Sequence, residues 1–170
     1  MIFVTVGTQG QFDRLIRTVD EWAGLRGRND VFAQTGPSDY RPNHIGNRSF
    51  ISPAEFRRYV ESANLVIAHA GMGSIITALE LGKRIIVMPR RADLGEHRND
   101  HQIATAKRLA EQGRIVVAGN EQQLLETLDH LEVFQETKRL DAQASPSLIG
   151  AIRSFINTGR IASGNVEISL

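Results

Sequence analysis

The sequence has no cysteine, and its net charge is only +1 over 170 residues. Without cysteine the chain can form neither disulfides nor thiolate metal sites, and it has no cysteine nucleophile. A charge this small creates no strong field for nucleic acid, so we expect no nucleic-acid partner. No apolar run is long enough to span a membrane, and the first residues lack the basic and cleavage regions of a signal peptide. We therefore expect a cytoplasmic protein.

Short apolar runs alternate with segments of helical periodicity. The runs have the length and composition of buried strands and lie at residues 2–6, 30–35, 65–68, 84–89 and 115–118, with a further short strand expected at 49–51. Apolar residues at helical spacing predict helices at residues 12–23, 75–82, 102–113, 122–131 and 147–156, and one that starts at Ser52. This alternation predicts an α/β fold with a Rossmann-like, mostly parallel sheet flanked by helices.

The length fits a single domain. We assign residues 1–157 to that domain because periodic segments continue up to that point. Residues 158–170 contain glycines and small polar side chains without periodicity, and we interpret them as a tail that is flexible or is ordered by a partner.

A glycine turn connects the strand at residues 65–68 to the helix at residues 75–82. Gly71 and Gly73 allow a sharp turn and a close approach to a ligand, and Ser74 is expected to cap the helix. A helix N-terminus beyond the end of a parallel strand favours anions, because free N–H groups and the helix dipole point at them. We therefore predict a phosphate site. An ordinary strand-to-helix turn is the alternative, since neither a complete dinucleotide fingerprint nor a Walker lysine is present.

Two further polar loops follow strands. Residues 7–10 come after the first strand, and residues 90–102 come after the strand that ends at Pro89. Ligands of parallel sheets bind beyond the carboxyl ends of the strands. Three loops at one edge of the sheet therefore predict a single ligand site.

The last of these loops ends in a helix start with polar side chains. Asn99 or Asp100 can cap this helix, and Ile103 is expected to point inward and set its rotation. His101 and Gln102 then lie in the first turn, near the ligand edge. The Gln102 amide carries donors and an acceptor, which suit adjacent sugar hydroxyls.

Five segments together resemble a known family, and they lie at residues 1–9, 12–16, 34–40, 69–74 and 89–102. They are similar to the nucleotide-sugar-binding half of GT-B glycosyltransferases, of the family 28 C-terminal domain type. They look closer still to the small catalytic subunits of two-chain glycosyltransferases. These include the eukaryotic subunit that adds the second GlcNAc to the dolichol-linked precursor, and bacterial exopolysaccharide and capsule enzymes, whose branch the segments resemble most.

The resemblance implies binding of a UDP-sugar and transfer of its sugar, with inversion, to a lipid-linked glycan acceptor in polysaccharide biosynthesis. No cofactor is expected, and no metal, since the chain lacks the Asp-x-Asp motif of the other glycosyltransferase architecture. The chain has about half the length of a two-domain enzyme, so we expect a membrane-anchored partner subunit to present the acceptor and hold the chain at the inner face of the membrane. The alternative is a nucleotide or nucleotide-sugar binding module without transfer activity.

The resemblance also implies roles for single residues. It places the turn at residues 71–74 against the diphosphate, His101 and Gln102 at the donor sugar, and residues 7–9 along the cleft towards the acceptor. Thr77 stands where many relatives carry a Glu that holds the ribose hydroxyls, and Glu80 could replace it. The expected donor-binding residues are Gly7, Thr8, Gln9, His69, Gly71, Met72, Gly73, Ser74, Thr77, Glu80, Arg90, His101 and Gln102.

Several charged or titratable positions have two interpretations each, and no catalytic residue is assigned. Arg90 and Arg91 could supply charge to the leaving nucleotide or form a solvated surface pair. His69 could be a structural histidine at the end of a strand or a catalytic base. His97 and His101 would share a face of a helix, as a zinc pair does, but no third ligand is evident and we expect no metal site.

Overall fold

The computed structural model describes residues 1–131. Its strands are β1 (Ile2–Thr5), β2 (Val31–Gln34), β3 (Gly46–Arg48), β4 (Leu65–His69), β5 (Arg84–Met88) and β6 (Val116–Val117). Its helices are α1 (Asp13–Leu25), α2 (Pro53–Ser62), α3 (Met72–Glu80), the short 3-10 helix η1 (Ala92–Leu94), α4 (His101–Glu111) and α5 (Glu121–Asp129). The helix expected at residues 147–156, the boundary at residue 157 and the tail at 158–170 lie outside the described residues.

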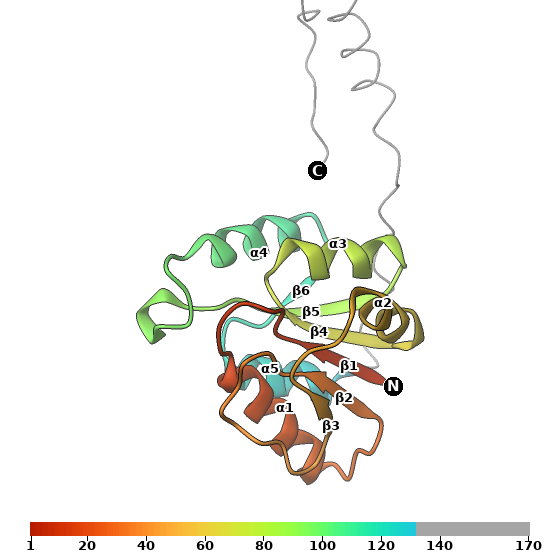
Figure 1. The fold of residues 1–170 in the computed structure, drawn as a ribbon. Coiled ribbons are helices and arrows are strands. Elements are labelled where there is room, and N and C mark those ends of the chain that lie inside the picture. The colour runs from red at the N-terminus through yellow and green to blue at the C-terminus, as the bar shows by residue number, and fades with distance from the viewer. Residues whose placement is uncertain (132–170) are drawn as a thin grey trace, which may run out of the picture. The chain divides into compact units, whose positions relative to one another are not determined.

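The strands form one parallel sheet in the order β3-β2-β1-β4-β5-β6 (Figure 1). From β1 the chain moves outward to β3 and then crosses to the other side of β1, where it continues through β4 to β6. The strand order therefore reverses between β1 and β4. In such sheets the ligand crevice opens beyond the carboxyl ends of the two strands at this switch point. The loops after β1 and β4 flank that crevice.

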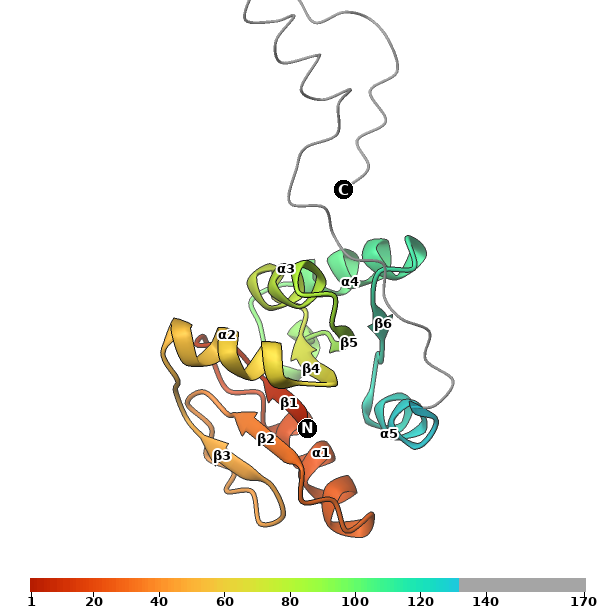
Figure 2. The same cartoon turned by 90° about the vertical axis from the view of Figure 1, so that its right-hand side faces the viewer.

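Successive strand residues face two different layers of helices. Val4 and Ile67 belong to a core with residues of α1 and α5, whereas Phe3 and Val66 belong to a core with residues of α2, α3 and α4. Figures 1 and 2 show the two groups of helices on opposite sides of the sheet. Because both faces are covered there, the inner strands β1, β4 and β5 are mostly apolar. The predicted α/β fold is confirmed. No helix of the described part is long and apolar enough to cross a membrane.

Helix α2 begins as its sequence predicts, but the expected short strand before it is displaced. The Ser52 hydroxyl accepts a hydrogen bond from the N–H of Glu55 at 3.2 Å, and the Glu55 carboxylate accepts one from the N–H of Ser52 at 2.9 Å. The prediction of a strand at residues 49–51 was wrong, because β3 at Gly46–Arg48 pairs with β2 instead. All three β3 residues are exposed, so this edge strand has no apolar pattern for the sequence to reveal.

The first turns of two helices also differ from expectation. Helix α3 already begins at Met72 with Gly71 as N-cap and no side-chain cap, so Ser74 lies buried inside the first turn. In α4 the prediction that Ile103 points inward was wrong, since Ile103 is 40% exposed while Ala106 is 1% exposed. The first turn of α4 contains no buried residue. Since this turn buries no residue, the rotation of the helix is set one turn later, at Ala106.

Candidate functional site

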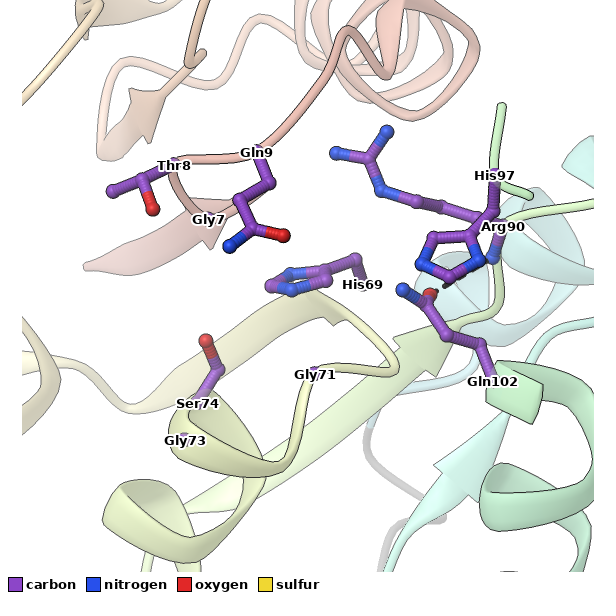
Figure 3. A pocket seen from close by; sticks show the side chains of 10 residues that line it. All are labelled: Gly7, Thr8, Gln9, His69, Gly71, Gly73, Ser74, Arg90, His97 and Gln102. Carbon is purple, nitrogen blue, oxygen red and sulfur yellow. Dashed lines mark hydrogen bonds between the residues drawn. The ribbon is translucent and has the colours of Figure 1, made fainter. Parts of the chain in front are cut away.

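A cavity of about 250 Å³ opens at the switch point. The loop after β1, the turn after β4 and the loop after β5 surround it (Figure 3), as the sequence predicted for these three loops. The lining residues are Gly7, Thr8, Gln9, His69, Gly71, Gly73, Ser74, Arg90, His97 and Gln102. Of the residues expected to bind the donor, Met72, Thr77, Glu80 and His101 do not line it. The other expected residues do.

The imidazole of His69 lies between Gly7 and Gly71 (Figure 3). A Cβ on Gly71 would lie 2.1 Å from Nε2 of His69, and a Cβ on Gly7 would lie 2.7 Å from Cε1. Gly7 also has a φ of 73°, which side chains with a Cβ rarely adopt. Both glycines are therefore required by the histidine ring. The sequence could not reveal this reason for their presence.

His69 has an unusually low pKa and an unpaired ring nitrogen. Its Nδ1 is buried and has no hydrogen-bond partner among the described residues. Burial lowers the pKa of His69 from its usual 6.5 to about 4, and the nearby positive charge of Arg90 contributes in the same direction. At neutral pH the ring is therefore uncharged, with one nitrogen able to donate and the other able to accept.

The first turn of α3 presents its backbone to the cavity. No side chain caps this helix end, and the N–H groups of a first helical turn have no partner within the helix. A Cβ added at Gly73 would meet no atom within 4 Å, so the space beside this residue is open. The helix end thus keeps free donors and the positive end of its dipole for an anion.

The Gln102 side chain is oriented by the backbone. Its Oε1 accepts a hydrogen bond from the N–H of Arg90 at 3.1 Å, drawn as a dashed line in Figure 3. The Nε2 group then remains to donate two hydrogens towards the cavity. The sequence analysis expected the Gln102 amide to offer both donors and an acceptor to the ligand. Because Oε1 is already bonded, only the Nε2 donors remain, and these suit oxygen atoms with free lone pairs.

Arg90 and Arg91 differ in environment. The Arg90 side chain is 1% exposed, and it donates hydrogen bonds to backbone carbonyls of the loop after β1. The interpretation as a solvated surface pair was therefore wrong for Arg90. Arg91 is partly exposed and pairs with Asp93 at 2.5 Å. Of the two, only Arg90 belongs to the wall of the cavity.

The expected residues that do not line the cavity lie on the outer parts of α3 and α4. The Thr77 hydroxyl donates to the carbonyl of Gly73 at 2.8 Å, within α3. Met72 is 46% exposed, and Glu80 and His101 are exposed as well. The expected roles of Met72 at the diphosphate, of Thr77 and Glu80 at the ribose and of His101 at the sugar stay predictions.

His97 lines the cavity, although the sequence analysis considered it only as half of a metal pair. It lies in the loop before α4 and therefore does not share a helical face with His101. Within residues 1–131 there is no group of three or more His, Cys, Asp or Glu side chains that could hold a metal ion. The position of His97 depends on the path of the loop, for which the sequence has no periodic signal.

Comparison with known proteins relates the chain to a family. Residues 1–155 match the glycosyltransferase family 28 C-terminal domain. The chain is 32% identical over 124 residues to the UDP-N-acetylglucosamine transferase subunit ALG13 of Homo sapiens, an alignment that covers 67% of this chain and 10% of the relative. The Mus musculus protein of the same name is 33% identical over 125 residues, with 66% and 10% covered. The chain thus spans 10% of the length of these curated relatives.

Solved structures agree with the fold. An NMR structure of ALG13 is similar with a TM-score of 0.58 at 20% identity, covering 87% of this chain and 92% of that one. The crystal structure of MurG from Acinetobacter baumannii is similar with a TM-score of 0.56 at 18% identity, covering 78% and 41%. At these identities the likeness concerns the fold alone. It shows a Rossmann-like half of the GT-B architecture.

Proposed function

We propose a function from one premise: the chain belongs to the glycosyltransferase family 28 C-terminal domain family. We propose that it binds a UDP-sugar in the cavity between the loops after β1, β4 and β5, and that the sugar is transferred with inversion to a lipid-linked glycan in polysaccharide biosynthesis. One observation carries the proposal. The uncapped N-terminus of α3 faces the cavity at the switch point of the sheet.

The diphosphate would lie against the first turn of α3. Negative charge grows on the leaving UDP as its bond to the sugar breaks, and preorganised N–H donors stabilise charge that develops there. The open space beside Gly73 leaves room for a phosphate group. Because the helix end itself supplies this stabilisation, we propose that transfer needs no metal ion.

The sugar would lie towards Gln102. Its Nε2 can donate to hydroxyl oxygens of the sugar, while its Oε1 is held by the N–H of Arg90. Removing a donor of this kind leaves a buried partner unpaired, at about 1–3 kcal/mol.

We further propose that a membrane-anchored partner subunit presents the acceptor and supplies the general base. No carboxylate is among the residues that line the cavity in the described part of the chain. At about 250 Å³ the cavity is also smaller than common ligand pockets, which measure about 300–1,000 Å³. A second chain would therefore complete the site. The human relative is itself named as a subunit of its transferase. Through this partner the chain would lie at the inner face of the membrane.

The same missing carboxylate favours a second candidate, a nucleotide-sugar binding module without transfer activity. The two candidates differ only in turnover. Purified chain with its co-expressed partner, a UDP-sugar and a lipid-linked acceptor should release UDP if the first candidate is right. Tight binding of UDP-sugar without any release of UDP would support the module.

The binding site is tested by thermal shift against UDP and a panel of UDP-glucose, UDP-galactose, UDP-GlcNAc and UDP-glucuronic acid. A ligand at 100 times its dissociation constant stabilises the protein by about 2.7 kcal/mol. No stabilisation by any nucleotide would overturn the proposal.

Isothermal titration of Gln102 variants then tests the sugar contact. Gln102→Ala should weaken the UDP-sugar about tenfold or more while UDP binds nearly as before, since the loss of about 1–3 kcal/mol falls on the sugar. Gln102→Glu should bind no better than Gln102→Ala, because an oxygen replaces the Nε2 donors. Gln112→Ala, at the far end of α4, is the matched control and should bind like the unaltered chain. Equal losses for UDP and UDP-sugar would place Gln102 at the nucleotide or in the scaffold.

A further inference from the structure

We infer that Arg90 is a positioning residue, whose buried guanidinium ties together the loops around the cavity instead of contacting the donor. The inference rests on the proposed function for the identity of the ligand. It goes beyond that function by assigning the group that holds two walls of the site to each other. It also replaces the expectation that Arg90 supplies charge to the leaving nucleotide.

The hydrogen bonds of the guanidinium all go to backbone carbonyls. Its Nη2 donates to the carbonyl oxygens of Val6 at 3.0 Å and Gly10 at 3.1 Å. Its Nη1 donates to the carbonyl oxygens of Gln11 and, at 3.3 Å, Glu96. The first three acceptors belong to the segment after β1, and the fourth belongs to the loop after β5. One side chain therefore connects two loops that are far apart in the sequence.

These bonds use every terminal donor of the side chain. A guanidinium carries four hydrogens on its two terminal nitrogens and one on Nε. With the four terminal hydrogens directed at carbonyls, the planar fork that grips a phosphate through two parallel bonds is already occupied. The side chain is also 1% exposed. Arg90 thus keeps only its Nε hydrogen and lacks the free terminal fork and the exposure that a bidentate phosphate contact needs.

The environment of Arg90 stabilises the buried cation without a direct ion pair. Its Cζ lies 4.8 Å from the centre of the Phe12 ring, in a cation–π arrangement. In the described part of the chain no carboxylate oxygen lies within ion-pair distance of the guanidinium. Carbonyl dipoles and the aromatic face contact the charge, and the Glu96 carboxylate stabilises it from a longer distance.

The same residue also orients Gln102 in the first turn of α4. Its backbone N–H donates to Oε1 of Gln102 at 3.1 Å, which turns the Nε2 donors of Gln102 towards the cavity. The loop between them is fixed from the other side, because the Glu96 carboxylate accepts hydrogen bonds from Arg14 at 2.7 and 2.8 Å. A shift of Arg90 would therefore disturb both the loop after β1 and the side-chain amide of Gln102.

The positioning role and the charge role predict different effects of lysine. A lysine keeps the positive charge but has one nitrogen with three hydrogens, which cannot serve four carbonyls in two loops. If Arg90 acts by charge, Arg90→Lys should retain much of the binding. If Arg90 acts as a cross-link, Arg90→Lys should fail nearly as badly as Arg90→Met.

The experiment compares the complete 170-residue chain with Arg90→Lys, Arg90→Met and the matched control Arg91→Met. Amide hydrogen exchange of the free proteins reports on residues 7–11 and 91–102, with β4 as the internal reference for the fold. Titrations with UDP and UDP-glucose at low and high salt report on the ligand. We expect both Arg90 variants to exchange faster in the two loops but not in β4, and to bind UDP-glucose at least tenfold more weakly at either salt concentration. Arg91→Met should match the unaltered chain in both measurements.

Three outcomes would overturn the inference. Arg90→Lys with unaltered affinity and exchange, beside a salt-sensitive loss in Arg90→Met, would mean that the charge acts on the donor. Faster exchange throughout the sheet, even in the milder Arg90→Lys, would mean a general fold defect. Unchanged exchange in both loops would mean that no cross-link exists. If the unaltered chain binds no nucleotide, the proposed function is wrong, while the exchange measurement still decides the role of Arg90.

Discussion

Acidification from pH 8 to pH 5 should destabilise this protein through a single histidine. Burial and the charge of Arg90 lower the pKa of His69 to about 4 in the folded state, against 6.5 for an ordinary histidine. Between these two values the unfolded chain binds a proton that the folded chain does not. The contribution of His69 to the free energy of unfolding is therefore fully present above pH 6.5, and it decreases as the pH falls towards 4.

The size of the effect follows from the two pKa values. Each unit of difference corresponds to about 1.4 kcal/mol, so the full loss below both values is about 3 kcal/mol. At pH 5 an ordinary histidine is almost fully protonated, whereas the folded His69 is about one-tenth protonated, which gives a loss of about 2 kcal/mol relative to pH 8. Two kcal/mol is a large fraction of the 5–15 kcal/mol by which domains are commonly stable.

Urea unfolding at pH 8, 6.5 and 5 measures this loss, with the fluorescence of Trp22 as the probe. Trp22 is the chain's single tryptophan and is 4% exposed in the core. The difference between the unaltered chain and His69→Gln isolates the contribution of His69, because groups common to both proteins cancel. Among these groups is buried Asp20, whose pKa is lowered from 3.8 and which acts at lower pH. His101→Gln replaces an exposed histidine and should keep the slope of the unaltered chain.

The contrast between the variants decides the matter. The unaltered chain should lose about 2 kcal/mol more than His69→Gln between pH 8 and pH 5. If the two proteins lose stability in parallel over this range, His69 is not held neutral by burial. If the unaltered chain gains stability relative to the variant, the folded state binds the proton more tightly, and the reasoning about the ring between two glycines has the wrong sign.

Three further predictions concern the phosphate turn, metals and a buried carboxylate. Gly73→Val should fold normally, because its side chain enters open space, but should abolish UDP binding in isothermal titration; unchanged affinity in a folded variant would remove the phosphate from this turn. EDTA should leave UDP-sugar binding and transfer unchanged, whereas a loss that a divalent ion restores would show a metal requirement. Asp20→Asn should lower the free energy of unfolding by at least about 1–3 kcal/mol, because the carboxylate is fully buried and accepts bonds from the Tyr40 hydroxyl and from the N–H groups of residues 43–45; a loss below about 0.5 kcal/mol in urea unfolding would contradict the reasoning.

The main architecture was predictable because it depends on burial. Strands covered on both faces, such as β4, must be continuous apolar runs, and the capping signals at Ser52 and Glu55 act over three residues. The meeting of three loops followed from the same pattern, since parallel strands place their carboxyl ends at one edge. Elements that bury few side chains could not be predicted from the sequence. Strand β3 is fully exposed, and the first turn of α4 lies free of the core, so the prediction for Ile103 failed there.

Contacts between distant segments could also not be predicted from the sequence. A buried arginine that is held by carbonyls requires no particular residue type at its partners, because every residue carries a carbonyl group. The four acceptors of Arg90 therefore leave no trace in the sequence. The bidentate pair of Arg14 and Glu96 does involve specific side chains, but nothing local indicates that they meet.

The two glycines of the turn after β4 meet different requirements. Both were assigned to the ligand from their spacing, but the Cβ position of Gly71 is occupied by the His69 ring, whereas that of Gly73 is open. A substitution at Gly71 must displace the histidine before it can affect any ligand, so its effects on folding and on binding cannot be separated. A Cβ at Gly73 meets no atom of another segment within 4 Å, so a substitution there acts first on what enters the cavity. The Gly-x-Gly spacing therefore combines a packing constraint with a binding constraint, and Gly73 is the position at which binding can be tested by itself.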